Sequence, residues 1–94
     1  MLYVITCLDK PDSAALRAET RPAHLDHIRA NIRNVLLAGP VLAEDEKTPV
    51  GSMLVVEFDT RAELERFSAE DPYVKAGLFQ SVTVRPFRKV FPEA

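Results

Sequence analysis

The sequence predicts an α+β fold built in the order strand, helix, strand, strand, helix, strand. The chain has 94 residues, which is the usual size of one domain and too short for two independent cores. Its apolar segments change along the chain from strand-like to helix-like periodicity in that order. With 47% hydrophobic and 28% charged residues, the composition excludes an intrinsically disordered chain. We therefore expect a single domain over residues 1–94.

The first strand is expected over residues 2–8, because Leu, Tyr, Val, Ile and Thr favour strands and the Asp-Lys-Pro sequence at 9–11 ends the run. From residue 13 to about residue 37 the pattern is helical. Pro22 interrupts it, and proline suits the first turn of a helix far better than the interior. We therefore expect a short helical piece before Arg21 and a longer helix after it.

The longer helix is expected to be buried along one face. Its apolar stripe consists of five side chains at helical spacing: Leu25, Ile28, Ile32, Val35 and Leu36. A strand over residues 35–43 competes with the end of this helix, since residues 38–40 read Ala-Gly-Pro and mark an exit. The polar segment 44–49 is predicted to be a mobile hairpin loop.

The second half of the chain again begins with a strand that is followed by a helix. Residues 51–58 form the clearest strand, and the Asp-Thr pair at 59–60 is a helix cap before a second amphipathic helix. Asp followed by Pro at residues 71–72 predicts a short extra helix that ends at Gly77. The last strand is expected over residues 80–90, and a proline at position 86 indicates an edge position or a strand end.

This order is the ferredoxin-like β-α-β-β-α-β arrangement, in which two helices cover one face of a four-stranded antiparallel sheet. The other face stays uncovered. Residues 53–56 and 3–8 include apolar side chains on both sides of their strands, so the open face carries apolar area. Because exposed apolar patches mark interfaces, we expect a homodimer in which two open faces pack together and enclose a cavity.

Charge and cysteine content exclude several classes of partner. Twelve Lys and Arg against fourteen Asp and Glu give a net charge of −2, so neither nucleic acid nor a membrane is an expected partner. RNA recognition on the open face would also need basic and aromatic residues, and the strand over residues 53–58 offers one Phe and neither Lys nor Arg. The single cysteine, Cys7, lies in a predicted buried strand, which indicates an inert thiol and a reducing compartment. The apolar run at the start of the sequence ends at residue 9, too soon for a signal peptide or a membrane span, so we expect a cytoplasmic protein.

The two histidines differ in their position on the predicted helix. His24 lies at the border of the apolar stripe, so it can face a pocket, whereas His27 is expected to face water. Spacing alone favours a structural role for both. A metal site built on the two is not expected, because they diverge on the helix and no cysteine or carboxylate stands at a recognised ligand spacing.

Other polar residues also have structural interpretations from spacing alone. Asp71 is expected to cap a helix, Arg21 to be a solvated charge at a helix start, Ser52 to open a strand, and Tyr73 to be a core ring with its hydroxyl at the rim. The sequence has no glycine-rich phosphate loop, Cys-x-x-Cys pair or nucleophile elbow, and we expect no cofactor.

Several motifs together nevertheless resemble the YCII-related family, and the match covers essentially the whole chain in the same order. They are Arg21-Pro-Ala-His-Leu25, Ala38-Gly-Pro40, Gly51-Ser52, Asp71-Pro-Tyr-Val-Lys-Ala-Gly77 and Val82-Thr-Val-Arg-Pro-Phe-Arg-Lys-Val90. The resemblance implies a dimeric α/β barrel on the ferredoxin-like fold and a cleft holding a His-Asp pair. Carried over to this chain, the pair is His24 and Asp71, with Ser52 near the same cavity.

Better understood relatives of the family are similar to muconolactone isomerases and to dehalogenases that act on chlorinated muconolactones. These reactions transfer a proton at a carbon beside a carbonyl, which needs a base and a group that stabilises the enolate. In this interpretation His24 is the base and Asp71 orients it, while Arg21, Ser52 and Tyr73 contact the substrate. The reversed assignment, with Asp71 as base and His24 as donor, stays open.

The competing hypothesis is a non-enzymatic module that binds a small metabolite or a partner in the same cleft, since this fold serves both purposes. A His-carboxylate contact of about 3 Å inside a cavity favours an enzyme. A cleft lined only by apolar groups favours binding alone.

Overall fold

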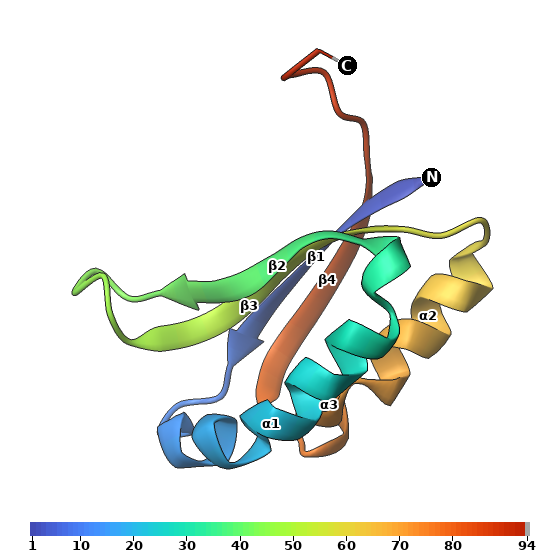
Figure 1. Ribbon diagram of the computed structural model, residues 1–94. Coiled ribbons are helices and arrows are strands. Elements are labelled where there is room, and N and C mark those ends of the chain that lie inside the picture. The colour runs from blue at the N-terminus through green and yellow to red at the C-terminus, as the bar shows by residue number, and fades with distance from the viewer. Residues whose placement is uncertain (94) are drawn as a thin grey trace.

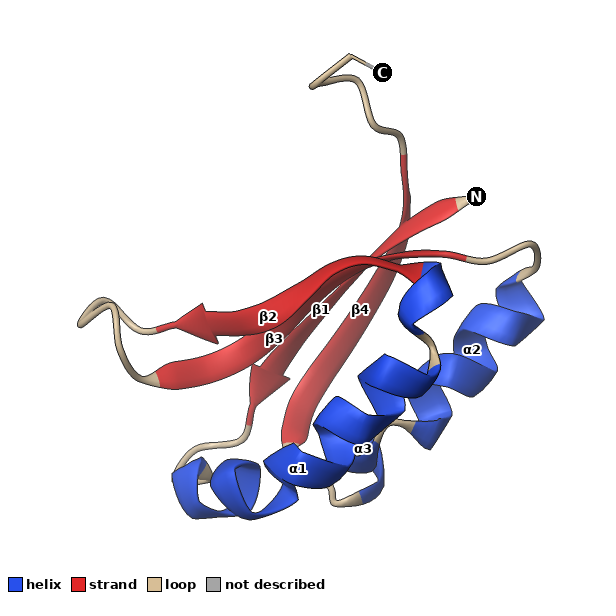
Figure 2. Cartoon of the chain, viewed as in Figure 1, coloured by secondary structure: helices blue, strands red, loops and turns tan. Residues whose placement is uncertain are grey.

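A computed structural model describes residues 1–93 and confirms the predicted α+β class. Four strands form one sheet: β1 (Leu2–Asp9), β2 (Val35–Leu42), β3 (Pro49–Glu57) and β4 (Phe79–Phe87). The order across the sheet is β2-β3-β1-β4 and each neighbouring pair is antiparallel. The helices lie on one face of this sheet (Figures 1 and 2): α1 (Ala14–Ala30), α2 (Arg61–Glu70) and the short α3 (Pro72–Lys75). This is the expected ferredoxin-like arrangement.

The core lies between the sheet and the helices. Alternate side chains of β1, namely Tyr3, Ile5 and Cys7, point toward the helices and are buried. Leu64 and Phe67 on α2 pack in the same cluster. The amphipathic second helix predicted from the sequence therefore forms and buries its apolar side.

Helix α1 differs from the prediction, because it continues through Pro22 without a break. A proline inside a helix costs about 3 kcal/mol through the missing N–H and the crowding of its ring. Pro22 lies on the exposed side, whereas Arg17, His24 and Ile28 are buried along the opposite side of the same helix. We attribute the continuity to this shared packing, which involves residues on both sides of Pro22 and outweighs the local cost.

The end of α1 also differs from the prediction. The helix stops at Ala30, and a short 3₁₀ helix (Ile32–Asn34) leads directly into β2, so the competing strand prediction is the correct one. Of the expected buried stripe, Ile32 and Leu36 are exposed, and Val35 is the first residue of β2. Pairing with this segment satisfies backbone groups of β3, which a longer helix would leave unpaired at a sheet edge.

The remaining elements agree with the sequence to within a few residues. Residues 43–48 connect β2 to β3, and α3 begins at Pro72 as expected. Strand β4 lies at the edge of the sheet, as the proline at position 86 predicted, but it ends at Phe87. In the described part of the chain, residues 1–93, no helix has the length and apolar character needed to cross a membrane.

The face of the sheet opposite the helices is uncovered (Figure 2). As predicted, it carries apolar area. Five large side chains from all four strands are exposed there: Leu8, Leu37, Val41, Met53 and Phe87.

Candidate active site

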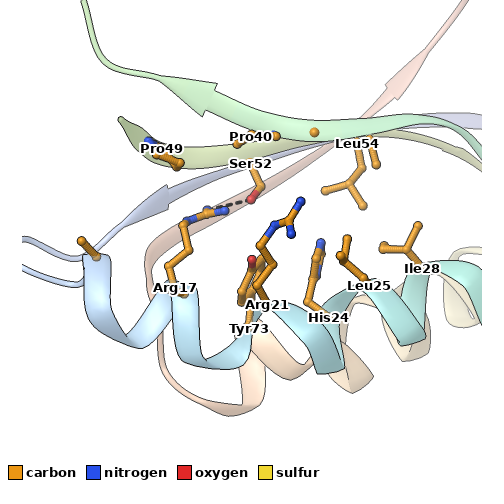
Figure 3. A pocket seen from close by; sticks show the side chains of 14 residues that line it. Arg17, Arg21, His24, Leu25, Ile28, Pro40, Pro49, Ser52, Leu54 and Tyr73 are labelled. Atoms are coloured by element: carbon orange, nitrogen blue, oxygen red, sulfur yellow. Dashed lines mark hydrogen bonds between the residues drawn. The ribbon is translucent and has the colours of Figure 1, made fainter. Parts of the chain in front are cut away.

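A cavity of about 350 Å³ lies between helix α1 and strands β2 and β3, on the helix side of the sheet (Figure 3). Its polar lining consists of Arg17, Arg21, His24, Ser52 and Tyr73. Its apolar lining includes Leu25, Ile28, Ala38, Pro40, Pro49 and Leu54. These residues therefore lie on the helix side of the sheet, apart from the open face through which the homodimer is expected to form.

His24 and Asp71 meet although they come from different helices. The Nδ1 atom of His24 lies 2.9 Å from Oδ1 of Asp71, and both residues are buried. The same Oδ1 atom accepts the backbone N–H of Tyr73 at 2.9 Å, so Asp71 caps α3 as predicted. One carboxylate thus fixes both the start of α3 and the orientation of the imidazole.

The contact with Asp71 determines which nitrogen of His24 faces the cavity. Because a carboxylate oxygen accepts hydrogen bonds, Nδ1 carries the hydrogen, and Nε2 of the neutral ring keeps its lone pair. Within residues 1–93 Nε2 has no hydrogen-bond partner, but it is accessible to solvent, and His24 lines the cavity. Asp71 does not line the cavity. A ligand in the cavity would therefore meet His24 and not Asp71.

Tyr73 forms one wall beside the imidazole. Its ring stacks on His24, with the centroids 4.0 Å apart and the planes inclined by 16°. The prediction that its hydroxyl reaches the rim of the molecule is wrong, because Tyr73 is 1% exposed. Burial raises the pKa of the Tyr73 hydroxyl, although the charges of Arg17 and Arg21 act in the opposite direction. The ring therefore limits the rotation of His24 and adds a flat apolar surface to the cavity.

Arg17 is a functional candidate that the sequence analysis did not identify. Its Nε donates to Asp9 Oδ2 at 2.7 Å, while its Nη2 donates to Asp9 Oδ1 at 2.9 Å and to Ser52 Oγ at 2.8 Å. Burial acts to lower the pKa of the Arg17 guanidinium, but the hydrogen bond and charge of Asp9 prevail and raise it. The signal was the seven-residue spacing to His24, which places both side chains on one helix face once α1 is continuous.

Arg21 and Ser52 complete the polar lining. The guanidinium of Arg21 points into the cavity in Figure 3, and Arg21 makes no ion pair with any other described residue. It lies in the interior of α1 and not at a helix start as predicted. Ser52 is buried in β3 opposite Pro40 of β2. The cavity thus combines an imidazole nitrogen, a hydroxyl and an unpaired positive charge.

His27 and Cys7 have structural roles. The prediction that His27 faces water is wrong, because its Nε2 lies 2.9 Å from the carbonyl oxygen of Phe67 and its ring stacks on that residue. Burial raises the pKa of the Cys7 thiol to about 12, which leaves it protonated and inert near neutral pH. Across residues 1–93, no three His, Cys, Asp or Glu side chains gather in a way that could hold a metal ion.

Comparison with known sequences gives a consistent result. Residues 1–88 match the model of the YCII-related domain. The chain is 40% identical over 98 aligned positions to Protein YciI of Escherichia coli O6:H1, with 97% of this chain and 100% of that protein covered. It is 37% identical, with the same coverage, to an uncharacterized protein of Haemophilus influenzae.

Comparison with solved structures gives a similarity in both sequence and fold. The 5-chloro-2-hydroxyhydroquinone dehydrochlorinase TftG from Burkholderia phenoliruptrix, in complex with 2,5-dihydroxybenzoquinone, is 32% identical with a TM-score of 0.87 and 94% of each chain covered. An antibiotic biosynthesis monooxygenase has a TM-score of 0.60 at 20% identity, with 96% of this chain and 99% of that chain covered, which shows the shared fold alone.

Proposed function

Because the chain belongs to the YCII-related domain family, we propose that it is a small-molecule enzyme that transfers a proton at a carbon beside a carbonyl. In this proposal His24 is the catalytic acid and base. Asp71 is the positioning residue that orients the imidazole and stabilises its protonated form. The reaction is an elimination or an isomerisation of a ring compound.

The observation that carries the proposal is the contact between His24 and Asp71. At 2.9 Å it is a His-carboxylate contact of the length that favours an enzyme, and it leaves Nε2 directed to a cavity that also holds charged and hydroxyl groups. A module that only binds an apolar metabolite would have no use for an oriented imidazole. The geometry also favours His24 over Asp71 as the base, because Asp71 does not line the cavity.

The proposed elimination or isomerisation needs no external oxidant or reductant. Nε2 of His24 takes the proton from the carbon, and the electron pair of that C–H bond moves toward the carbonyl to form an enolate. In an elimination, the enolate expels a halide with its bonding pair, and the proton on His24 later passes to water. In an isomerisation, His24 returns the proton to a different carbon.

The lining of the cavity indicates the class of substrate. Leu25, Ile28, Leu54 and the Tyr73 ring supply apolar contacts for a flat ring, and Arg21 supplies a positive charge for an ionised oxygen. A hydroxylated or halogenated ring related to the 5-chloro-2-hydroxyhydroquinone named for TftG has these properties. Lactones of the muconolactone type have them as well.

We further propose that the protein is a homodimer formed through the open face of the sheet. That face exposes apolar side chains from all four strands, and it also carries Glu57 and Arg85, whose opposite charges allow pairing across a two-fold axis. Light scattering at micromolar concentration is expected to give twice the monomer mass. Replacing Met53 and Leu37 with Lys should then give monomers, and a monomeric wild-type protein would contradict the dimer.

Turnover of a small panel tests the enzymatic proposal. We expect the purified protein to release chloride from 5-chloro-2-hydroxyhydroquinone or to isomerise an unsaturated lactone. His24→Ala should lose this activity, whereas the matched variant His27→Ala should keep it, because His27 contacts Phe67 and lies outside the cavity. Equal activity of His24→Ala and wild type would contradict the proposal.

A further inference from the structure

A second buried polar network lies beside the cavity and shares no hydrogen bond with the pair of His24 and Asp71. The Arg17 guanidinium lies 4.7 Å from the centroid of the Tyr73 ring, which stacks on His24. It consists of Asp9, Arg17 and Ser52, joined by the three hydrogen bonds of the Arg17 guanidinium at 2.7 to 2.9 Å. The side chains of Asp9 and Arg17 are each 8% exposed. In Figure 3, Ser52 and the guanidinium of Arg17 lie on the side of the cavity away from His24.

Stability alone does not account for this network. Removing two charges from water costs several kcal/mol per ion, and apolar side chains of similar volume often hold a fold equally well. A buried ion pair at the wall of a cavity is better explained by a role in fixing the position of a neighbouring group. Here that group is the hydroxyl of Ser52, which accepts a hydrogen bond from Arg17 and lines the cavity.

The contact with Arg17 determines what the Ser52 hydroxyl can do. A guanidinium only donates hydrogen bonds, so Ser52 accepts in this contact and its own hydrogen points elsewhere. Ser52 donates to no protein group among residues 1–93, and it lines the cavity. Its O–H is therefore available to an oxygen atom of a ligand.

We infer that Asp9 and Arg17 are positioning residues that hold the Ser52 hydroxyl as the hydrogen-bond donor to the ligand oxygen on which negative charge develops. The inference rests on the proposed function, in which His24 works at the neighbouring carbon. A hydroxyl that accepts a hydrogen bond from a cation is a stronger donor itself. A donor fixed before the reaction stabilises a developing oxyanion without reorganisation.

In the reaction Ser52 keeps its proton. As the proton leaves carbon for His24, the electron pair of the C–H bond forms a C–C double bond and the carbonyl π pair moves onto oxygen. Ser52 donates its hydrogen bond to that oxygen. The pair returns when the halide departs with its bonding electrons or when a carbon takes a proton back, and Arg17 and Asp9 touch no reacting atom.

Binding of 2,5-dihydroxybenzoquinone provides a test that does not depend on turnover. The probe carries ionisable ring oxygens, and its visible absorption band reports hydrogen bonds to them. We expect wild type to bind it and Ser52→Ala to bind about tenfold or more weakly, with a shifted band for the bound probe. Equal affinity and an identical band in Ser52→Ala would overturn the inference, as would a wild-type protein that does not bind the probe.

The positioning role is tested with Asp9→Asn/Arg17→Met, which removes the ion pair without leaving one charge buried alone. Circular dichroism should show a folded protein, and affinity and band should approach those of Ser52→Ala. Adding Ser52→Ala to this variant should then change little, because the two changes act on one hydrogen bond. The matched control is Asp26→Asn/Arg29→Met, which removes an exposed ion pair from the same helix and should bind as wild type.

Additive losses in the combined variant, or wild-type binding by Asp9→Asn/Arg17→Met, would overturn the positioning role. The two proposals fail in different ways. If the probe responds as described and no compound turns over, the proposed function fails and the role of Ser52 stands. If compounds turn over and Ser52→Ala leaves binding and band unchanged, only the inference fails.

Discussion

Asp71 accepts two hydrogen bonds on the same oxygen, one from His24 Nδ1 and one from the backbone N–H of Tyr73, each at 2.9 Å. His24 and Asp71 are 47 residues apart in the chain. The carboxylate that begins α3 therefore also connects that helix to α1. The orientation of the imidazole depends on the same atom as the local fold.

Substitution of Asp71 separates these two roles. Asp71→Asn keeps an oxygen that caps α3, so its melting temperature should stay near that of wild type. Turnover should fall about 10²-fold or more, because a neutral amide does not stabilise the protonated imidazole. Asp71→Ala should lose both activity and about 1 kcal/mol of stability. Steady-state kinetics and thermal unfolding measure the two effects, and wild-type turnover in Asp71→Asn would contradict the assigned role.

Arg21 should determine the preference for anionic ligands. Its charge points into the cavity and is unpaired within residues 1–93, so Arg21→Ala should weaken binding of an ionised ring compound about tenfold. The melting temperature should not change, because the side chain is exposed. Titration at rising ionic strength provides the check: affinity of wild type should fall with salt more steeply than that of Arg21→Ala. Parallel salt dependences would argue against this role.

The buried Cys7 thiol makes stability depend on alkaline pH. Burial, assisted by the charge of Asp71, raises the pKa of Cys7 from 9.0 to about 12 in the folded protein. Between these values the unfolded chain loses the thiol proton while the folded chain retains it, so the unfolded state binds fewer protons. The free energy of unfolding should therefore fall as pH rises from about 9 toward 12.

Denaturant unfolding at several pH values measures this effect. In Cys7→Ala the fall above pH 9 should be smaller than in wild type, since the titrating thiol is gone. Iodoacetamide should also label native wild type far more slowly than the unfolded chain at the same pH. Equal labelling rates would contradict the burial of the thiol.

Gly51 should be required for the approach of β3 to β1. A Cβ atom at this position would collide with the backbone carbonyl oxygen of Cys7, which cannot move as a flexible side chain can. Gly51→Ala should lose about 1–3 kcal/mol of stability. It should also weaken ligand binding, because Ser52 is the next residue. Gly39→Ala is the matched control, since no described atom lies near its added Cβ, and it should unfold as wild type does.

The sequence predicted the sheet better than the helices. β-branched and aromatic residues mark β1 and β3, and the apolar side chains on both sides of these strands correctly indicated an apolar open face. The break predicted at Pro22 was wrong, because packing of α1 against the sheet outweighs the local penalty of a proline inside a helix. The error at Leu36 has a related cause: backbone pairing with β3 decides between strand and helix, and it depends on residues far along the chain.

The sequence predicted only part of the site, because packing and strand pairing bring together residues that lie far apart in the chain. His24 and Ser52, which the family resemblance implied, line the cavity together with the candidate substrate contacts Arg21 and Tyr73, and their roles stay predictions. Arg17 was missed because the expected break at Arg21 removed it from the helix face of His24. Its partner Asp9 lies at the end of β1, and only the fold places these two groups beside Ser52.

Hydrogen exchange at carbon is the most direct test of whether His24 transfers a proton beside a carbonyl in this cavity. The ring C–H groups of 2,5-dihydroxybenzoquinone lie next to carbonyl carbons, and their replacement by deuterium in D₂O is followed by NMR. We expect wild type and His27→Ala to accelerate this exchange and His24→Ala to leave it at the rate without protein. Acceleration by His24→Ala equal to that of wild type would contradict proton transfer by His24, as would the absence of acceleration by wild type.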